Sequence, residues 1–180
     1  MAAAVSAETH KGYETPPYSV EAAEGAMELR RYGAHLVAEV TVAGSREAAI
    51  NTGFRMLAGY IFGGNAKGES IAMTVPVAQS AVAEGTWTVR FMMPGGSDAA
   101  TLPQPGDDRI RFVTVGPERQ TALRFSGLRG TETLQARADE LRAWTTAQGL
   151  TITTGPHFYF YDGPMTLPWM RRNEVAFTVQ

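Results

Sequence analysis

The sequence predicts a single α+β domain in which two βαββ-like halves share one sheet system. Order along the chain is the first observation: strands, a helix and strands are followed by strands, a second helix and strands. Periodicity is the second, because strand segments alternate apolar and other residues whereas helical segments repeat apolar residues at helical spacing. Length is the third, since 180 residues without an evident linker suit one domain with a substantial core.

Three strands and a helix are predicted in the first part of the chain. The strands cover residues 18–21, 26–32 and 35–42. Ser45 is a good N-cap for the helix, which runs through Phe62 until a Gly-Gly-Asn stretch ends it.

The rest of the chain repeats this order with more turns. Its predicted segments are strands at residues 70–74, 86–93, 109–115 and 120–126, a helix at 131–148, and strands at 152–161 and 174–179. Pro76 requires an edge or a bulge near the first of these strands. The Pro/Gly/Asp-rich segment 95–108 is the longest loop. The turn at Gly116-Pro117 indicates that the two strands beside it pair with each other in antiparallel fashion.

Composition excludes several kinds of site and partner. The chain has no cysteine, which excludes disulfides, zinc–thiolate sites, iron–sulfur clusters and thiolate-ligated heme. Its net charge is −2, with arginines and acids interspersed, so we expect no nucleic-acid partner. No run of about 20 apolar residues occurs, so we expect no transmembrane segment. The oligomeric state does not follow from these observations.

Residues 1–17 are predicted to form a flexible leader, and residues 18–180 the folded domain. Val5-Ser6-Ala7 is similar to the small-residue end of a signal peptide, and a flexible Ala-rich leader explains the same residues equally well. We therefore expect a cytoplasmic protein or, if the segment is the remnant of a signal peptide, a periplasmic or exported one.

Few residues suggest metal binding or catalysis. Among the three histidines, His10 falls in the predicted leader, and His35 lies on a strand. His157 opens a Phe-Tyr-Phe-Tyr strand and points with Tyr159 and Tyr161. No pair has metal-ligand spacing, so a structural role is favoured for each, and His157 is only a weak candidate metal ligand. Whether the protein is an enzyme, and which residues would be catalytic, stays open.

The first helix carries a second stripe beside its core face. Ile50, Leu57 and Ile61 face the core. The adjacent stripe, too wide for the same core, consists of Asn51, Phe54, Arg55, Ala58 and Phe62. One interpretation is a wide buried face with one solvated arginine. The other is the wall of a groove for a flat apolar ligand, in which Arg55 meets an anionic substituent.

The loop before the last predicted strand is rich in apolar residues. Pro164 and Pro168 fix the backbone and remove donors, so the segment is neither a central strand nor a helix. It presents four large apolar side chains and ends in the double arginine Arg171-Arg172; the four are Met165, Leu167, Trp169 and Met170. Large apolar side chains gathered on a surface usually mark a binding site.

The chain resembles the SOUL heme-binding family from about residue 18 to residue 179. The motifs that carry the resemblance are Glu28 to Gly33, the helix end with Leu57, Tyr60-Ile61 and Gly64-Asn65, Ile71 to Val77, Phe91 to Pro94, Leu102 to Pro105, Phe125-Ser126-Gly127, and Tyr161 to Val175. Each motif alone is weak. Their order and spacing across nearly the whole chain are specific.

This resemblance implies a distorted antiparallel β-barrel of about eight or nine strands flanked by two helices, related to the GyrI and Rob effector-binding fold. It also implies non-covalent binding of heme or another porphyrin in a shallow apolar groove between the first helix and the C-terminal loop, with the protein acting as a carrier or buffer. The residues of this groove are Asn51, Phe54, Arg55 and Ala58 on the helix and Met165, Leu167, Trp169 and Met170 opposite. Arg55, Arg171 or Arg172 would neutralise the propionates.

Two departures from the family pattern argue against a histidine-ligated heme. Arg31 stands where some animal members carry a histidine proposed as axial ligand, and a guanidinium cannot ligate iron. Thr166 stands where related members have a lysine. Binding is then expected to rest on apolar contact and propionate pairing. The weak ligands that remain are Met165, Met170, Tyr161 and His157.

Two other classes of function stay open. One is an enzyme that acts on the bound macrocycle, for example by removing its metal. The other is a GyrI-like module that binds or hydrolyses a small molecule. Glu39 or Glu174 lining a dry pocket with a raised pKa would favour this second class.

Overall fold

The computed structural model describes residues 9–180, so the predicted signal-peptide end at Val5-Ser6-Ala7 lies outside the described residues. A short hairpin comes first, formed by β1 (Thr9–His10) and β2 (Tyr13–Glu14). The first half contains β3 (Tyr18–Glu24), β4 (Met27–Tyr32), β5 (His35–Ala43), α1 (Arg46–Ile61), β6 (Val77–Ala83) and β7 (Thr86–Met92). The second contains β8 (Arg111–Val115), β9 (Glu118–Phe125), α2 (Thr131–Ala147), β10 (Ile152–Phe160), the 3-10 helix η1 (Pro168–Met170) and β11 (Asn173–Val179).

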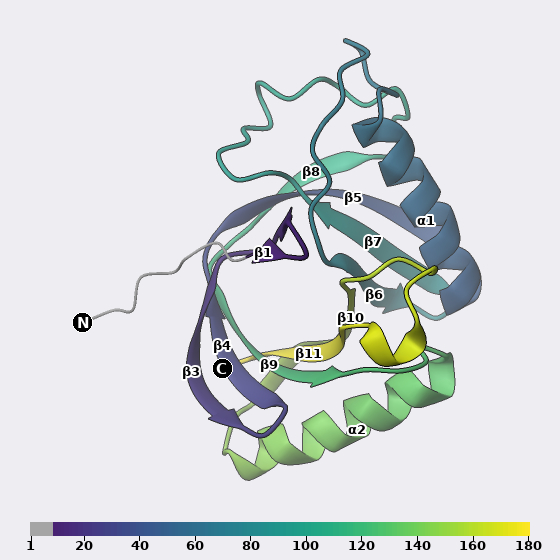
Figure 1. Ribbon diagram of the computed structural model, residues 1–180. Helices are drawn as coiled ribbons and strands as arrows, with labels where there is room; N and C mark the ends of the chain where they lie inside the picture. Colours follow the sequence, from purple (N-terminus) through teal and green to yellow (C-terminus); the bar gives the residue numbers. More distant parts are fainter. Residues whose placement is uncertain (1–8) are drawn as a thin grey trace.

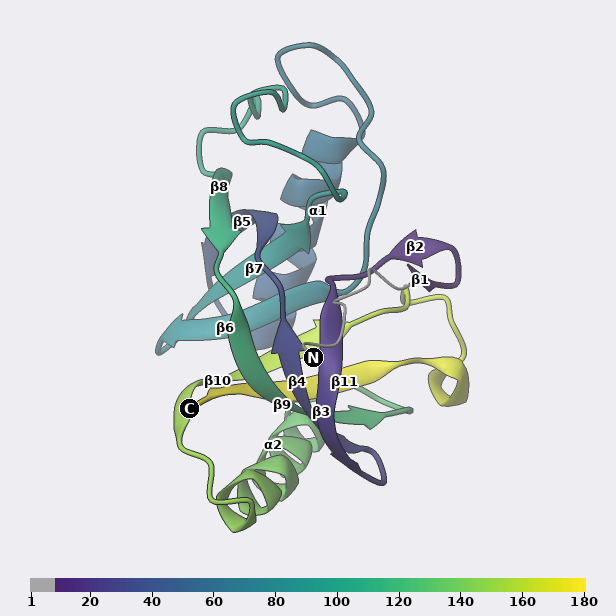
Figure 2. The same ribbon diagram turned by 90° about the vertical axis from the view of Figure 1, so that its left-hand side faces the viewer.

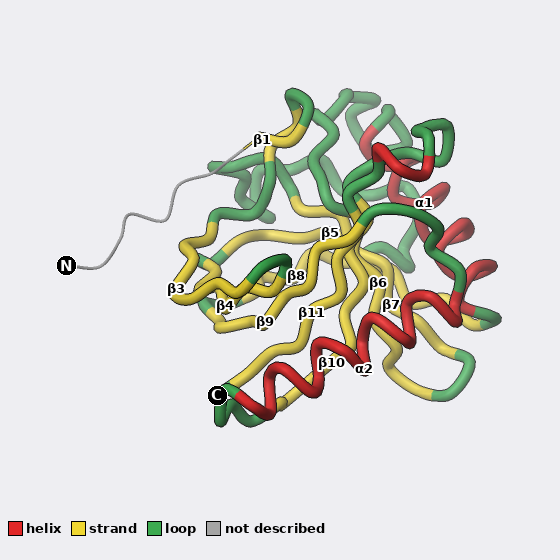
Figure 3. Tube along the Cα trace, turned by 60° about the horizontal axis from the view of Figure 1, so that its bottom comes forward, coloured by secondary structure: helices red, strands yellow, loops and turns green. Residues whose placement is uncertain are grey.

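Nine of the strands form one curled antiparallel sheet in the order β3-β4-β9-β11-β10-β6-β7-β5-β8 (Figure 1). The two helices lie on its outer side, and both remain outside the curl in a second view (Figure 3). The predicted α+β class with a distorted sheet of this size is confirmed. Because β3 and β8 are the two edges of this sheet, it is an open half-barrel. In residues 9–180, no helix is long and apolar enough to cross a membrane.

Each half adds a strand to the sheet of the other half. The units β5-α1-β6-β7 and β9-α2-β10-β11 occupy equivalent places on either side of the central β6–β10 pair. Strand β4 of the first half pairs with β9, and β8 of the second half pairs with β5. The predicted hairpin between residues 109–115 and 120–126 is therefore wrong. Gly116-Pro117 turns the chain as expected, but β8 pairs with β5 of the first half, and β9 pairs with β4 of the first half and with β11 of its own half.

A second correction concerns the segment before β6. Residues 70–74, predicted as a strand, make only isolated bridges at Ser70 and Thr74, and the strand begins after Pro76. The backbone of the segment is used elsewhere: Ile71 N donates to Ile61 O at 2.7 Å, and Val75 N donates to Glu14 O at 3.0 Å. Proline has no N–H for the ladder, which explains why pairing starts beyond it.

Each helix covers its own apolar cluster. Leu134, Ala138 and Leu141 of α2 pack on a cluster from β9, β10 and β11, while Leu57 and Ile61 of α1 pack on one from β5, β6 and β7. The predicted N-cap is confirmed, because the Ser45 side chain accepts from Ala48 N. The strands thus turn their apolar face outward to the helices, and their other face lines the inside of the curl.

The hairpin of residues 9–14 lies beside the C-terminal loop (Figure 2). His10 Nε2 lies 3.3 Å from both carboxylate oxygens of Asp162, and Lys11 Nζ donates to the same carboxylate. Glu14 accepts from Gly95 N at 2.9 Å. Where the sequence predicted a flexible leader, residues 9–17 lie against the body of the protein.

Two glycines of α1 test how closely this helix packs on the sheet. A Cβ at Gly53 would lie 2.6 Å from Val89 Cγ2, whereas a Cβ at Gly59 would meet nothing within 4 Å. We expect Gly53→Ala to lower the free energy of unfolding by about 1–3 kcal/mol through overpacking. Gly59→Ala should raise it by about 0.5–1 kcal/mol through helix propensity. Denaturant unfolding of both variants measures this, and equal effects would contradict the close approach.

Candidate functional site

The inner face of the half-barrel is polar and aromatic. It surrounds a cavity of about 150 Å³ lined by residues from both halves, among them Tyr32, Ser80, Gln120, His157 and Tyr159. This volume is below the roughly 300 Å³ at which ligand pockets usually begin. Tyr159 and Tyr161 line it together with His157, so these three side chains of one strand face share a direction, as predicted.

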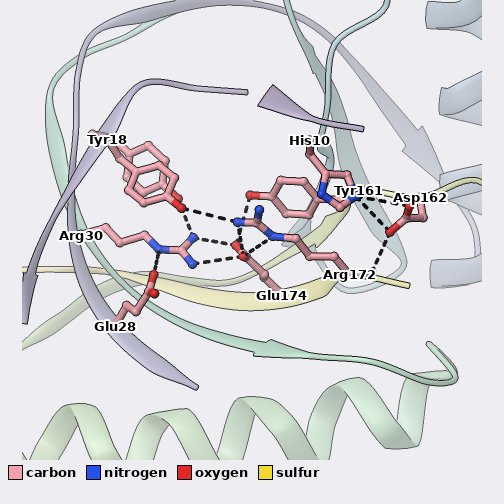
Figure 4. A network of polar contacts seen from close by, with 9 residues as sticks. His10, Tyr18, Glu28, Arg30, Tyr161, Asp162, Arg172 and Glu174 are labelled. Carbon is pink, nitrogen blue, oxygen red and sulfur yellow. Dashed lines mark hydrogen bonds and ion pairs between the residues drawn. The ribbon is translucent and has the colours of Figure 1, made fainter. Parts of the chain in front are cut away.

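A buried ion cluster closes one end of this face. The Glu174 carboxylate on β11 has no exposed surface, and Arg30 and Arg172 converge on it (Figure 4). Arg30 Nη1 donates to Glu174 Oε2 at 2.7 Å, and Arg172 Nε donates to Oε1 at 2.9 Å. Tyr161 OH donates to Oε2 at 3.2 Å, and Glu28 accepts from Arg30 Nε at 2.7 Å. Arg172 is thus held in the interior of the protein.

These contacts decide the charge state of the cluster. Burial alone would raise the pKa of Glu174, but Arg30 and Arg172 outweigh it and keep that pKa below its usual value. Glu39, the other carboxylate considered, pairs with Arg90 at 2.7 Å. Glu174 is therefore not a dry carboxylate with a raised pKa, the feature that would favour a GyrI-like module, and Glu39 is held in an ion pair.

Both ring nitrogens of His157 form hydrogen bonds with hydroxyl groups of the inner face. Nδ1 lies 2.7 Å from Ser80 Oγ, and Nε2 lies 3.2 Å from Thr178 Oγ1 and 3.3 Å from Thr154 Oγ1. Burial, assisted by the Arg90 cation, lowers the pKa of His157 to about 4. Within residues 9–180, no three His, Asp or Glu side chains gather as a metal site would require. The geometry favours a structural role for this histidine.

A larger pocket lies between α1 and the start of the C-terminal loop. The ribbon view shows the loop approaching α1 (Figure 1). We call this pocket the α1 pocket; its volume is about 430 Å³. Its carbon walls come from α1, the segment before β6, the first residue of β6, and the end of β10. The lining residues that form these walls are Ile50, Phe54, Met73, Val75, Val77 and Phe160. Phe54 is 40% exposed although it is a large apolar side chain, which makes the pocket accessible from solvent.

Two arginines contribute positive charge to the α1 pocket. Arg46 opens α1 and donates to Gln79 Oε1 at 3.3 Å and to Arg129 O at 2.8 Å. Arg129 precedes α2, donates to Asp162 O at 3.2 Å, and stands 5.1 Å above the Phe160 ring. Burial, together with the nearby cations Arg171 and Arg46, lowers the pKa of Arg129. The lining also includes the carboxylates of Asp162 and of Glu47, which pairs with Arg46 at 3.2 Å, so Arg129 is the better placed of the two arginines to meet an anionic group.

The structure brings together only part of the predicted groove. Asn51 and Phe54 line the α1 pocket; Arg55 and Ala58 lie further along the helix and are not among its lining residues. On the loop side the lining residues are Asp162, Gly163 and Pro164. The apolar residues predicted to lie opposite the helix are instead at least half exposed; these are Met165, Leu167, Trp169 and Met170.

The arginines predicted to meet propionates have other partners. Arg172 belongs to the Glu174 cluster, and Arg171 donates to Thr166 O at 2.7 Å and Pro164 O at 2.8 Å. The residues that sequence reasoning missed are Arg46 and Arg129. Arg46 follows the N-cap Ser45, and Arg129 stands in a Gly-Leu-Arg-Gly stretch. Neither local pattern indicates a binding role, because the two meet only through the tertiary fold.

Comparisons with known proteins agree with this architecture. The C-terminal domain of EcmrR matches with a TM-score of 0.66 at 11% sequence identity, covering 91% of this chain and 98% of that one. A hydrolase from Listeria innocua matches with a TM-score of 0.60 at 13% identity, covering 89% and 94%. SAV2435 bound to tetraphenylphosphonium matches with a TM-score of 0.50 at 13% identity, covering 86% and 93%. At these identities the likeness shows the fold alone.

Sequence comparison gives a family. The family model described as SOUL heme-binding protein matches residues 13–178, nearly the whole chain. Among curated proteins, no sequence matches significantly.

Glu174→Gln should be strongly destabilising. It would leave Arg30, whose side chain is 1% exposed, without its buried counter-charge, and loss of one partner of such a pair costs about 3–5 kcal/mol. Glu28→Gln is the matched control, because Glu28 binds the same guanidinium but is 31% exposed. It should cost less than about 1 kcal/mol. The free energy of unfolding of each variant is the measurement, and similar losses would show that the buried pair is not the main support.

His157 should make the protein less stable in weak acid. The unfolded chain binds a proton on this ring below about pH 6.5, whereas the folded chain binds it only below about pH 4. Stability therefore falls as the pH decreases through this window, by about 1.4 kcal/mol per pH unit from this group. Unfolding of wild type and His157→Gln between pH 7 and pH 5 checks the sign, with roughly 2 kcal/mol less loss expected in the variant. Parallel pH profiles would contradict the low pKa.

Proposed function

Because this chain belongs to the SOUL heme-binding protein family, we propose that it binds heme or a related tetrapyrrole in the α1 pocket and acts as its carrier or buffer. The observation that supports this most is the pairing of an open apolar wall around Phe54 with the two cations Arg46 and Arg129. A volume of about 430 Å³ lies within the range of small-molecule sites, roughly 300–1,000 Å³.

The chemistry of the lining suits a flat apolar ring with acidic substituents. Ile50, Phe54 and Phe160 would contact the macrocycle, and Arg46 and Arg129 would meet its propionates. Each charge-assisted contact contributes about 1.5–3 kcal/mol. Bound heme would bring an iron centre, for which Met73 offers a thioether; the described lining includes no histidine. Binding should therefore depend little on the metal.

A carrier fits the pocket better than an enzyme does. The acidic side chains at its rim, Glu47 and Asp162, are held in ion pairs, Glu47 with Arg46 and Asp162 with Lys11 and His10. Burial would raise the pKa of Asp162, but the N–H of Arg172 and the Lys11 and His10 side chains outweigh it and lower the pKa. A carboxylate held ionised in this way is a poor general acid at neutral pH.

A Soret-band titration of the purified protein tests this function. We expect saturable one-to-one binding of hemin and of metal-free protoporphyrin, with dissociation constants within about tenfold, or 1.4 kcal/mol, of each other. The hemin spectrum should then stay unchanged for hours. Slow conversion to the metal-free spectrum, absent without protein, would show an enzyme, and a lack of saturable binding would exclude the carrier.

A pair of arginine variants locates the anionic groups. Arg129→Gln should weaken protoporphyrin binding about tenfold, because one charge-assisted contact is lost. Arg55→Gln, at an exposed position that does not line the pocket, should bind like the wild type. Protoporphyrin dimethyl ester, which lacks the carboxylates, should bind wild type and Arg129→Gln equally. Weaker binding in Arg55→Gln alone would contradict the α1 pocket and support the groove predicted from the sequence.

A further inference from the structure

The C-terminal loop carries an apolar surface that the α1 pocket does not use. We call it the loop patch; its members, with exposed fractions, are Leu128 (66%), Met165 (94%), Leu167 (50%), Trp169 (69%) and Met170 (57%). Gly127 N donates to Pro168 O at 2.9 Å, which joins the segment of Leu128 to the loop. Half of the large apolar side chains that are exposed in the described chain gather here. Such a gathering marks an interaction surface.

The loop is held in shape from inside. Arg171 Nε donates to Thr166 O at 2.7 Å, and its Nη2 donates to Pro164 O at 2.8 Å. At the start of the loop, Asp162 Oδ2 accepts from Arg172 N at 2.7 Å. The polar backbone is thus tied inward while the apolar side chains of the patch remain exposed. A surface ordered in advance loses little entropy when it binds.

Positive charge borders the patch. Trp169 and Met170 form one side of a shallow depression lined by five basic side chains: His10, Lys11, Arg124, Arg171 and Arg172. His10 and Lys11 pair with Asp162, and Arg172 pairs with Glu174. In the described part of the chain, the cations here without an acidic partner are therefore Arg124 and Arg171. Arg171 donates its hydrogen bonds to backbone carbonyl oxygens, which carry no formal charge and so leave its positive charge unpaired. These two cations lie beside the patch although the net charge of the whole chain is −2.

We propose that the loop patch docks this protein on an anionic membrane surface. Tryptophan and methionine side chains would enter the headgroup boundary, and the neighbouring cations would meet acidic headgroups. A second copy of the chain fits less well, because a face-to-face pair would bring the two basic borders together. The tetrapyrrole fits less well too, because the α1 pocket is lined by Gly163 and Pro164 rather than by the patch. The proposal goes beyond ligand binding, and in setting the tetrapyrrole aside it rests on the α1 pocket being the ligand site.

Vesicle co-sedimentation of the full chain tests the proposal. We expect binding to vesicles that contain phosphatidylglycerol, at least about tenfold stronger than to phosphatidylcholine alone and weakened by salt. The double variant Met165→Ser/Trp169→Ser should lose at least about tenfold in affinity. Phe62→Ser is the matched control, since Phe62 is 67% exposed at the end of α1 and should be dispensable. No binding by wild type, or equal binding by the double variant, would overturn the proposal.

Two further measurements test the alternative partners of the loop patch, which are the tetrapyrrole and a second copy of the chain. The double variant should titrate with protoporphyrin like the wild type, because the α1 pocket is intact. If porphyrin binding fails while vesicle binding persists, the patch belongs to the ligand site and the membrane proposal is wrong. Sedimentation velocity should give wild type and double variant the same mass without vesicles. A dimer found only in wild type would assign the patch to self-association instead.

Discussion

The rest of the architecture depends on the buried carboxylate of Glu174. It draws Arg30 of β4 and Arg172, at the end of the C-terminal loop, onto β11. The backbone N–H of Arg172 donates to the carboxylate of Asp162, and this carboxylate also accepts from Lys11 of the hairpin. One buried charge therefore positions the sheet, the loop and the hairpin. In residues 9–180, every buried side-chain nitrogen and oxygen has a partner, as such a cluster requires.

This cluster also decides where a ligand can bind. With Glu174 neutralised by two arginines, the inner face of the half-barrel offers a small polar cavity whose groups already satisfy one another. The α1 pocket, in contrast, keeps an apolar wall and guanidinium groups that repel one another. The proposed ligand site would then lie outside the curl of the half-barrel, because function resides in the site and not in the fold.

Local patterns predicted most of the elements, although β6 begins beyond the strand predicted at residues 70–74, and long-range contacts decided the rest. Helical spacing and the Ser45 cap located α1 to within a residue or two, and alternation located β5, β7 and β11. The pairing of β8 with β5 could not be predicted from the sequence. A Gly-Pro turn between two strands occurs both when these strands pair with each other and when each pairs with a different strand. Arg129 was missed for a related reason: its neighbour Arg46 lies 83 positions away in the chain. The loop residues were correctly singled out as unusual, but their direction depends on the brace made by Arg171.

The α1 pocket and the loop patch meet within the C-terminal loop, so ligand binding and membrane binding could affect each other. Gly163 and Pro164 line the pocket, and the patch begins at Met165. If docking changed the loop, membrane and ligand affinities would alter each other reciprocally. The Arg171 brace spans this junction, since it holds Pro164 O and Thr166 O together. A junction tied in this way transmits little change, so docking would bring the pocket close to the bilayer without opening it. Loss of the brace, rather than docking itself, would be the event that couples the two surfaces.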